Sequence, residues 1–516
     1  MTIASAPRSV LTRHWGKLLL VAGGLMVVAI ILVLALVVPQ WPFREGELKK
    51  RIETEMNGTV QFGHYRQVFL PHPGAVIDLM TLTPRDPSRP KITAQRVTIR
   101  GLYWGLFVTP KHLKAMSFDG LEISFPPKDG KHNTQTQNGK DASKDDTRYD
   151  EVDAKDSRVV FAGADGAGPQ TYEIYQLVMK NFSATGPMHF SSNLKIPTPV
   201  ANVAVSGIFG PINHQKLGET PLSGKFTMKN ANLATFRSLY GTLAGYGEFQ
   251  GKLGELKVNG GTEMQNFGVT DTAHDLPLKT QFTVMVDGTS GNVEFEPIHA
   301  TLGKTKLVAQ GQLADSADKK KTLTLNISSN DARIEDLMYL FVHSKKPPLA
   351  GPTQFKMDVK LPSGDAPFEK RVEMKAHFGI EKSKFTHSDT EQKVSALSEA
   401  ARGNPKDEDP PTVVSDLTGD LTLKGGTANF SRLDCDVPGA SAKLHGKYNL
   451  ESHAVDLHGM LQTDVKLSKA TTGFKAFLMK VVEAAKKKKK EGATVPVKIT
   501  GTYEKPDFGL DATAEK

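Results

Sequence analysis

Two kinds of hydrophobic pattern divide this chain. Leu18–Val38 is a continuous apolar run of 21 residues without a charged side chain. As a helix rising about 1.5 Å per residue, such a run spans the hydrocarbon thickness of a bilayer. Beyond it, hydrophobic and polar residues alternate with a period of two in many short runs, which is typical of half-buried strands. The pattern therefore predicts one transmembrane helix followed by a β-rich body.

The apolar run is interpreted as a signal anchor that is not cleaved. A secretory signal peptide is the main alternative, but its apolar region usually has only about 7–15 residues and ends at a small-residue cleavage site. This run is longer and continues into Pro39–Trp41. Arg8, Arg13 and Lys17 precede it without any acidic residue, and retained positive charge predicts a cytoplasmic N-terminus. We expect residues 1–17 to be a cytoplasmic tip and 18–38 the anchor.

The body reads as a succession of hairpins with a few helices. Its alternating runs are separated by turns that contain Pro and Gly and recur about every 10–15 residues, as in an antiparallel meander. A helix is expected at Phe43–Gly58, because Leu48 and Ile52 are spaced i, i+4 and Asn57-Gly58 is a stop signal. Three further segments show helical spacing of apolar residues: Asp331–His343, Thr390–Arg402 and Ala470–Ala485.

Two polar stretches divide the body. Residues 128–158 are rich in Lys, Asp, Asn, Gln, Thr and Ser, and such a segment buries too little apolar surface to offset its ordering entropy. We predict a polar mobile loop there; a binding segment is the alternative. Residues 404–411 form a charged linker broken by prolines. The predicted regions are an N-terminal β region (43–127), the loop, a central β-meander (159–403), the linker and a C-terminal module (412–516).

Composition and charge exclude some classes of function. The net charge is +9, and Lys486–Lys490 supplies five of the positive charges. The rest of the body is close to balanced, which argues against a nucleic-acid groove along its length. Cys435 is the only cysteine, so no internal disulfide can form. It lies between Asp434 and Asp436, and these carboxylates are expected to raise the pKa of its thiol.

No pattern in the chain predicts catalysis, a metal or a cofactor. Nucleophile-elbow, Walker, HExxH and dinucleotide-binding motifs are absent from the sequence. His445, His453 and His458 are irregularly spaced, and Asp456 is expected to share a strand face only with His458. We therefore predict that the protein is not an enzyme. An enzyme whose polar cluster assembles only in the fold is the remaining alternative.

Motifs near both ends of the body resemble those of a known family. The first region is Gly101–Phe125, which follows the anchor and the first helix. The second is C-terminal and contains Gly446–Leu450 (GKYNL), Leu457–Gly459 (LHG) and Pro496–Thr502 (PVKITGT), with Pro506 beyond. Together they resemble the AsmA-like family of bacterial envelope proteins. The resemblance covers both ends of the body, and the middle shares only the general pattern of strand, turn and strand.

This resemblance implies a fold, a location and a role. The expected fold is mainly β, with a single N-terminal transmembrane helix and an elongated, curved antiparallel sheet whose concave face is apolar. The protein would cross the bacterial inner membrane once, with most of the chain in the periplasm. It would take part in phospholipid transport or outer-membrane lipid homeostasis, with other envelope proteins as partners. The alternative is a scaffold or assembly factor for outer-membrane components that carries no lipid.

The alternating runs and the last helix supply the candidate contact residues. A continuous apolar surface shields acyl chains from water, and alternation places such residues on one sheet face; an ordinary closed core would give the same pattern. The lipid-contact candidates are Phe282, Val284, Val286, Leu323, Leu325, Ile327, Leu421 and Leu423. The membrane-surface candidates are Trp41, Phe474, Phe477, Leu478, Val481, Lys486 and Lys490. For the last helix, the alternative is a plug at the end of the sheet.

Overall fold

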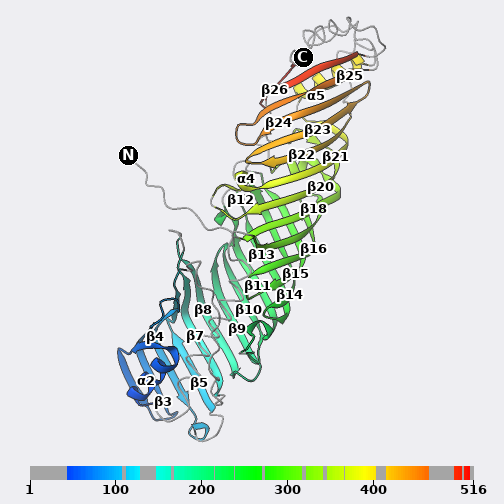
Figure 1. Ribbon diagram of the computed structural model, residues 1–516. Coiled ribbons are helices and arrows are strands. Elements are labelled where there is room, and N and C mark those ends of the chain that lie inside the picture. Colours follow the sequence, from blue (N-terminus) through cyan, green and yellow to red (C-terminus); the bar gives the residue numbers. More distant parts are fainter. Residues whose placement is uncertain are drawn as a thin grey trace, which may run out of the picture.

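A single long sheet runs through the described chain from one end to the other (Figure 1). The computed structural model describes residues 43–106, 112–127, 147–163, 168–213, 215–236, 239–269, 274–316, 321–340, 346–364, 366–386, 388–401, 414–463, 493–502 and 505–511. The predicted anchor 18–38 and Trp41 lie outside these residues. Among the described helices, none is long and apolar enough to cross a membrane.

In the part of the chain that the structure describes, the sheet comprises 27 strands, and helices are few. The first strands are β1 (Gly58–Gln61), β2 (His64–Val68), β3 (Gly74–Pro84), β4 (Lys91–Gly101), β5 (His112–Asp119), β6 (Glu122–Phe125), β7 (Arg148–Phe161), β8 (Gln170–Phe182), β9 (Met188–Pro197) and β10 (Val200–Phe209). The middle contains β11 (Pro221–Asn232), β12 (Leu239–Tyr240), β13 (Thr242–Lys252), β14 (Glu255–Val269), β15 (Leu276–Asp287), β16 (Asn292–Leu302), β17 (Thr305–Asp315) and β18 (Lys321–Arg333). The remainder comprises β19 (Leu349–Ala350), β20 (Pro352–Pro362), β21 (Glu373–Phe385), β22 (Ser415–Lys424), β23 (Thr427–Val437), β24 (Ala440–Asn449), β25 (Ala454–Thr463), β26 (Ala493–Thr502) and β27 (Lys505–Leu510).

The described helices lie between or beside the strands. They are α2 (Glu45–Met56), α3 (Ile334–Met338), α4 (Phe368–Arg371) and α5 (Ser388–Ala401), with short 3₁₀ turns η1 (Trp104–Leu106), η2 (Leu217–Glu219) and η3 (Leu233–Thr235). The helices predicted at 43–58, 331–343 and 390–402 are therefore confirmed in their positions, α3 being shorter than expected. The helix predicted at 470–485 lies outside the described residues.

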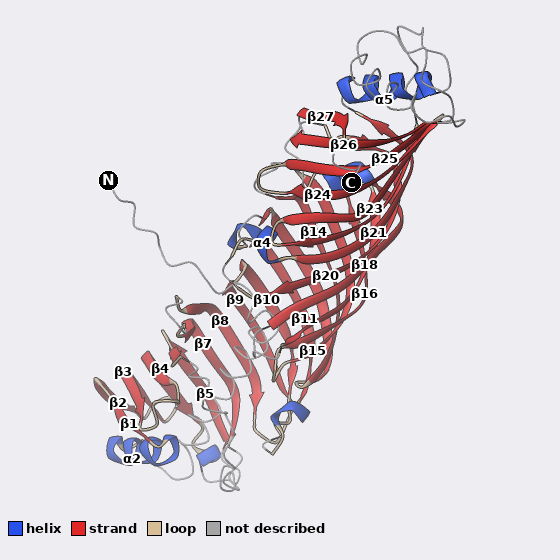
Figure 2. Cartoon of the chain, turned by 45° about the horizontal axis from the view of Figure 1, so that its top comes forward, coloured by secondary structure: helices blue, strands red, loops and turns tan. Residues whose placement is uncertain are grey.

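Consecutive strands pair almost throughout, as an antiparallel meander requires. From β7 to β11, from β13 to β18 and from β20 to β27 each strand pairs antiparallel with the next, while the short strands β12 and β19 pair with β14 and β21. The order of strands along the sheet therefore follows the sequence, and Figure 2 shows the strands stacked along one elongated, twisted surface. The prediction of a mainly β, mostly antiparallel sheet is confirmed.

One step of the sheet is parallel. β5 and β6 continue each other along the edge of β4, and both pair parallel with β7. Leu113 lies opposite Tyr149 at one end and Phe125 opposite Phe161 at the other, so the chain must return along the whole strand length before β7 begins. Parallel neighbours require a crossover connection of this kind. The polar segment 128–146, which joins the two strands in sequence, lies outside the described residues.

The predicted polar loop 128–158 is wrong over its last third. Arg148–Arg158 belongs to β7, where Tyr149, Val152 and Ala154 are at most 1% exposed. The outward positions of this strand carry its charged residues, so its average composition is that of a loop although its buried positions are apolar except for Ser157. The positive φ of Asp156 (47°) also breaks the period of two.

The first helix closes the N-terminal end of the sheet. Phe43, Leu48 and Ile52 are buried and belong to the same hydrophobic cluster as the first strands. The helix ends as predicted, because Asn57 takes the left-handed conformation (φ 46°) and its N–H donates to the carbonyl of Glu53. The Glu53 carboxylate then accepts the N–H of Val60 at 3.1 Å, which ties the helix to β1.

Candidate functional site

An unbroken row of apolar side chains and glycines crosses the sheet. Residues that lie directly opposite each other in a ladder project to the same face, so the register can be followed from strand to strand. The row comprises Ala75, Ile99, Met116, Val152, Met179, Phe190, Gly207, Gly224, Phe249, Val258, Val284, Phe295, Gly311, Leu325, Val359, Met374, Leu423, Ala428, Tyr448, Val455 and Gly501. It contains no polar side chain other than the phenol of Tyr448. We call the face that carries it the apolar face.

Neighbouring rows extend the apolar face on both sides. One contains Ile298, Ala309, Ile327, Met357, Ala376, Leu421, Phe430, Gly446, Leu457, Ile499 and Phe508. Another contains Met188, Phe209, Leu222, Gly251, Leu256, Val286, Val293, Leu313, Leu323 and Leu361. All eight residues selected as lipid-contact candidates lie on this face, because Phe282 is two positions from Val284 on β15.

The apolar face is closed at its N-terminal end and more open beyond. In the first row, Ala75, Met116, Val152 and Met179 are completely buried. Farther along the same row, Phe295, Leu325, Val359, Met374 and Val455 are only partly buried, whereas Leu423 and Ala428 are buried. The first part of the face is therefore a filled core, and the later part is less completely buried.

Phenylalanine rings lie against glycines along the apolar face. Four such pairs are direct cross-strand partners: Phe226–Gly247, Phe249–Gly224, Phe282–Gly260 and Phe378–Gly419. A Cβ added to any of these glycines would come within 2.5–2.8 Å of the ring, so each ring occupies the space that a side chain would take. Aromatic residues commonly cover strand glycines in this way. Each pair keeps the face apolar, and the ring lies over the glycine instead of beside a second large side chain.

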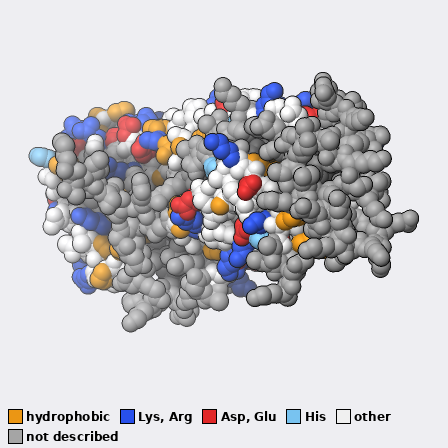
Figure 3. Space-filling view, turned by 90° about the horizontal axis from the view of Figure 1, so that it is seen from above, with side chains coloured by type: hydrophobic (Ala, Val, Ile, Leu, Met, Phe, Trp, Pro, Cys, Tyr) orange, Lys and Arg blue, Asp and Glu red, His pale blue; other side chains and the backbone are white. Residues whose placement is uncertain are grey.

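The opposite face of the sheet is charged. Ion pairs connect register partners across it, including Lys225–Glu248 at 2.9 Å and Glu263–Lys279 at 3.3 Å. Asp420 bridges His377 (2.7 Å) and Arg432 (2.9 Å), and the hydrogen bond from His377, together with Arg432, lowers the pKa of the aspartate. Described Lys, Arg, Asp and Glu side chains lie interspersed in the end-on view of Figure 3. One face of the sheet is therefore suited to water and the other to apolar material.

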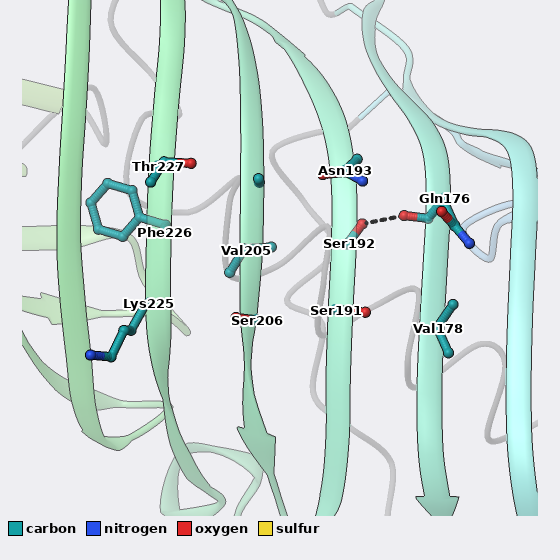
Figure 4. A pocket seen from close by; sticks show the side chains of 11 residues that line it. Gln176, Val178, Ser191, Ser192, Asn193, Val205, Ser206, Lys225, Phe226 and Thr227 are labelled. Atoms are coloured by element: carbon teal, nitrogen blue, oxygen red, sulfur yellow. Dashed lines mark hydrogen bonds between the residues drawn. The ribbon is translucent and has the colours of Figure 1, made fainter.

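A hollow of about 320 Å³ lies over β8–β11 (Figure 4). Its lining includes the small side chains Ser191, Ala204 and Ser206 together with Lys225, and it contains no His, Cys, Asp or Glu. The nearby Ser192 hydroxyl donates to the carbonyl of Gln176 at 3.0 Å. We find no nucleophile paired with a base in this lining.

The residues first considered for metal or thiol chemistry have structural partners. His458 is held between Asp511 (2.8 Å) and Asp456 (2.9 Å), whose hydrogen bonds raise its pKa. Burial, followed by the charges of Asp436 and Asp416, raises the pKa of Cys435 to about 12, in the direction expected from its neighbours. Among the described residues no group of three or more His, Cys, Asp or Glu could hold a metal ion.

The other candidate set lies outside the described residues. Phe474, Phe477, Leu478, Val481, Lys486 and Lys490 are all in the segment 464–492, and Trp41 precedes the described chain. The apolar side chains that are most exposed in the structure are instead Trp104 and Leu70. Sequence patterns gave no signal for them, since they lie in turns beyond the alternating runs.

Comparison of the sequence with known proteins identified no relative. No protein-family model and no curated protein matches the chain. The resemblance to AsmA-like proteins therefore rests on the quoted motifs and remains a prediction.

Proposed function

We propose that this protein is a membrane-anchored periplasmic protein of the AsmA-like type that shields phospholipid on an apolar sheet face during transport between, or homeostasis of, the envelope membranes. The observation that carries the proposal is the row of apolar residues and glycines that continues from β3 to β26 without a charged position. Acyl chains need a surface of this kind, because apolar groups gain free energy when they leave water.

The mechanism is passive. Acyl chains would lie along the less completely buried stretch from Phe295 to Val455, while headgroups remain in water beside the sheet. One phenylalanine–glycine pair, Phe378–Gly419, lies within this stretch, and the other three lie on the strands before it. No covalent step is involved, and the proposal assigns no catalytic residue, metal or cofactor.

Membrane attachment is part of the proposal. The apolar run 18–38 supplies a helix long enough to cross the inner membrane once, with the positive residues before it retained in the cytoplasm. It would fix the closed end of the apolar face at the membrane from which lipid enters. The open end, farther along the chain, would then point away from that membrane.

Site-specific photocrosslinking in cells tests this function. A photoreactive phenylalanine analogue at Leu325, on the apolar face, is expected to give a phospholipid adduct detectable by mass spectrometry of the intact protein. The matched control is the adjacent Asn326, which is exposed on the charged face and is expected to give none. If Leu325 and Val359 both give no lipid adduct in a folded protein, the lipid-free scaffold is the better interpretation.

A further inference from the structure

Four large apolar side chains are exposed together in two loops at one end of the first strands. The loop after β2 exposes Phe69 (57%) and Leu70 (78%), and the turn after β4 exposes Tyr103 (43%) and Trp104 (87%). We call these four residues the loop patch. Exposed Trp and Leu side chains cost free energy in water, so a group of them marks a surface that meets an apolar partner.

The two loops are held as one surface. The Gly101 N–H donates to the carbonyl of Pro73 at 2.6 Å, and the Tyr103 hydroxyl donates to the carbonyl of Phe69. Gly74 and Arg100 are register partners directly beneath the loops. The exposed side chains are therefore presented by a defined backbone arrangement that connects both loops.

The patch lies where the chain enters the fold. The side-chain amide of Gln67, two residues before Phe69, donates to the carbonyl of Phe43, the first described residue. The apolar run 18–38 ends only five residues earlier, a distance of at most about 18 Å along the chain. A helix in the bilayer would thus hold the loop patch close to the membrane surface.

The charges around the patch suit an anionic lipid surface. Arg66, Arg100 and Lys114 are exposed on the strands next to the loops, and the Lys114 ammonium lies 2.9 Å from the Nε2 atom of His72. Basic side chains beside Trp and Tyr are typical of the interfacial zone of a membrane, where aromatic rings sit at headgroup level.

We infer that the loop patch inserts into the interfacial region of a phospholipid bilayer on the side where the anchor emerges. This inference rests on the membrane anchor of the proposed function but not on lipid transport. The patch seats the closed end of the apolar face on the membrane. Together with the anchor it gives the protein two points of attachment, which restricts the tilt of the sheet relative to the bilayer.

The fluorescence of Trp104 tests the inference in the full-length protein. The chain has three tryptophans, so Trp15→Phe and Trp41→Phe leave Trp104 as the only reporter. The protein is reconstituted into phosphatidylglycerol-containing vesicles whose acyl chains are brominated near the headgroup. We expect blue-shifted emission, quenching by the brominated lipid, and a several-fold lower acrylamide quenching constant than in the Leu70→Asp variant of the same background.

A tryptophan placed elsewhere is the matched control. Tyr246→Trp, in a background with all three native tryptophans replaced by Phe, reports on a side chain that is 57% exposed on the charged face and should remain fully open to acrylamide. Open, red-shifted Trp104 emission in vesicles would overturn the inference, even if lipid adducts form at Leu325. Protection only in native membranes, not in pure lipid, would indicate a protein partner and would overturn it as well.

Discussion

Leu325 in β18 lies directly opposite Val359 in β20, with both side chains on the apolar face. Both are partly buried, so neither is sealed within a closed core. Each is followed or preceded by a polar residue on the other face, where the Asn326 amide donates to the Asp358 carboxylate at 2.5 Å. This alternation within one strand pair separates an apolar surface from a hydrated one by the thickness of the sheet.

A charge at this position should displace lipid. For Leu325→Asp we expect less phospholipid to be recovered with the purified full-length protein. A bound acyl chain would desolvate the new carboxylate, and a cost of only about 1.4 kcal/mol lowers the affinity for lipid about tenfold. The measurement is native mass spectrometry of bound lipid. The control is Thr324→Asp on the charged face, opposite Lys360, which should retain lipid. Equal lipid content in both variants would contradict an acyl-chain site on the apolar face.

Two methionines in the same row should differ in their contribution to stability. Met116 is completely buried, whereas Met374 is partly exposed. We expect Met116→Ala to lower the free energy of unfolding of its region by about 2–5 kcal/mol and Met374→Ala by about 1 kcal/mol or less. Hydrogen exchange of the strands around each site measures both. Similar losses would mean that the face is closed equally at both places.

The sequence predicted the alternating strands well because each carries its signal within itself. In β15, Phe282, Val284 and Val286 alternate with Thr283 and Met285 and follow the polar positions Lys279 and Gln281, and no information from neighbouring strands is needed to place the three on one face. The helix α2 was equally accessible, since its apolar spacing and its Asn57 stop are local features. These elements account for the confirmed β-rich fold and for the common face of all eight candidates.

Features that depend on distant parts of the chain were not predictable. The parallel pairing of β5 with β7 places Leu113 beside Tyr149, and no local pattern specifies it. No alternating pattern predicts β27, because Lys505–Leu510 has a proline and a glycine among only six residues. The loop patch has no local sequence signal for a different reason: its four residues become neighbours only when two separate turns meet.

A methyl group added at Gly260 should destabilise the sheet. Its Cβ would lie 2.3 Å from the carbonyl oxygen of Tyr246 and 2.8 Å from the Phe282 ring, so the strand or the ring must move. We expect Gly260→Ala to cost about 1–3 kcal/mol in denaturant unfolding, as overpacking does. Gly379→Ala, whose Cβ has no neighbour nearer than 3.7 Å, should change stability by less than about 0.5 kcal/mol. If the two variants unfold alike, Gly260 is not needed to accommodate the ring.

The C-terminal end of the sheet should loosen as pH rises. Hydrogen bonds to Asp511 and Asp456 raise the pKa of His458. Two other basic groups face it: Lys498 is its register partner on β26, and the ring centre of His445 is 6.5 Å away. These groups do not reverse the rise in pKa. A pKa that is higher in the folded than in the unfolded state stabilises the fold below the ordinary histidine value of about 6.5. This contribution is lost as pH rises through the folded pKa.

Hydrogen exchange of β27, corrected for the intrinsic effect of pH, measures this loss. Protection of Lys505–Leu510 should fall as pH rises above the ordinary histidine value of about 6.5 in the wild-type protein, because deprotonated His458 no longer pairs as a cation with Asp511, which follows β27 directly. His458→Gln should abolish the pH dependence, whereas His64→Gln, on β2 at the far end of the sheet, should preserve it. If the pH dependence persists in His458→Gln, another titrating group causes it. The ion pair between His458 on β25 and Asp511 at the end of β27 would then not account for the effect.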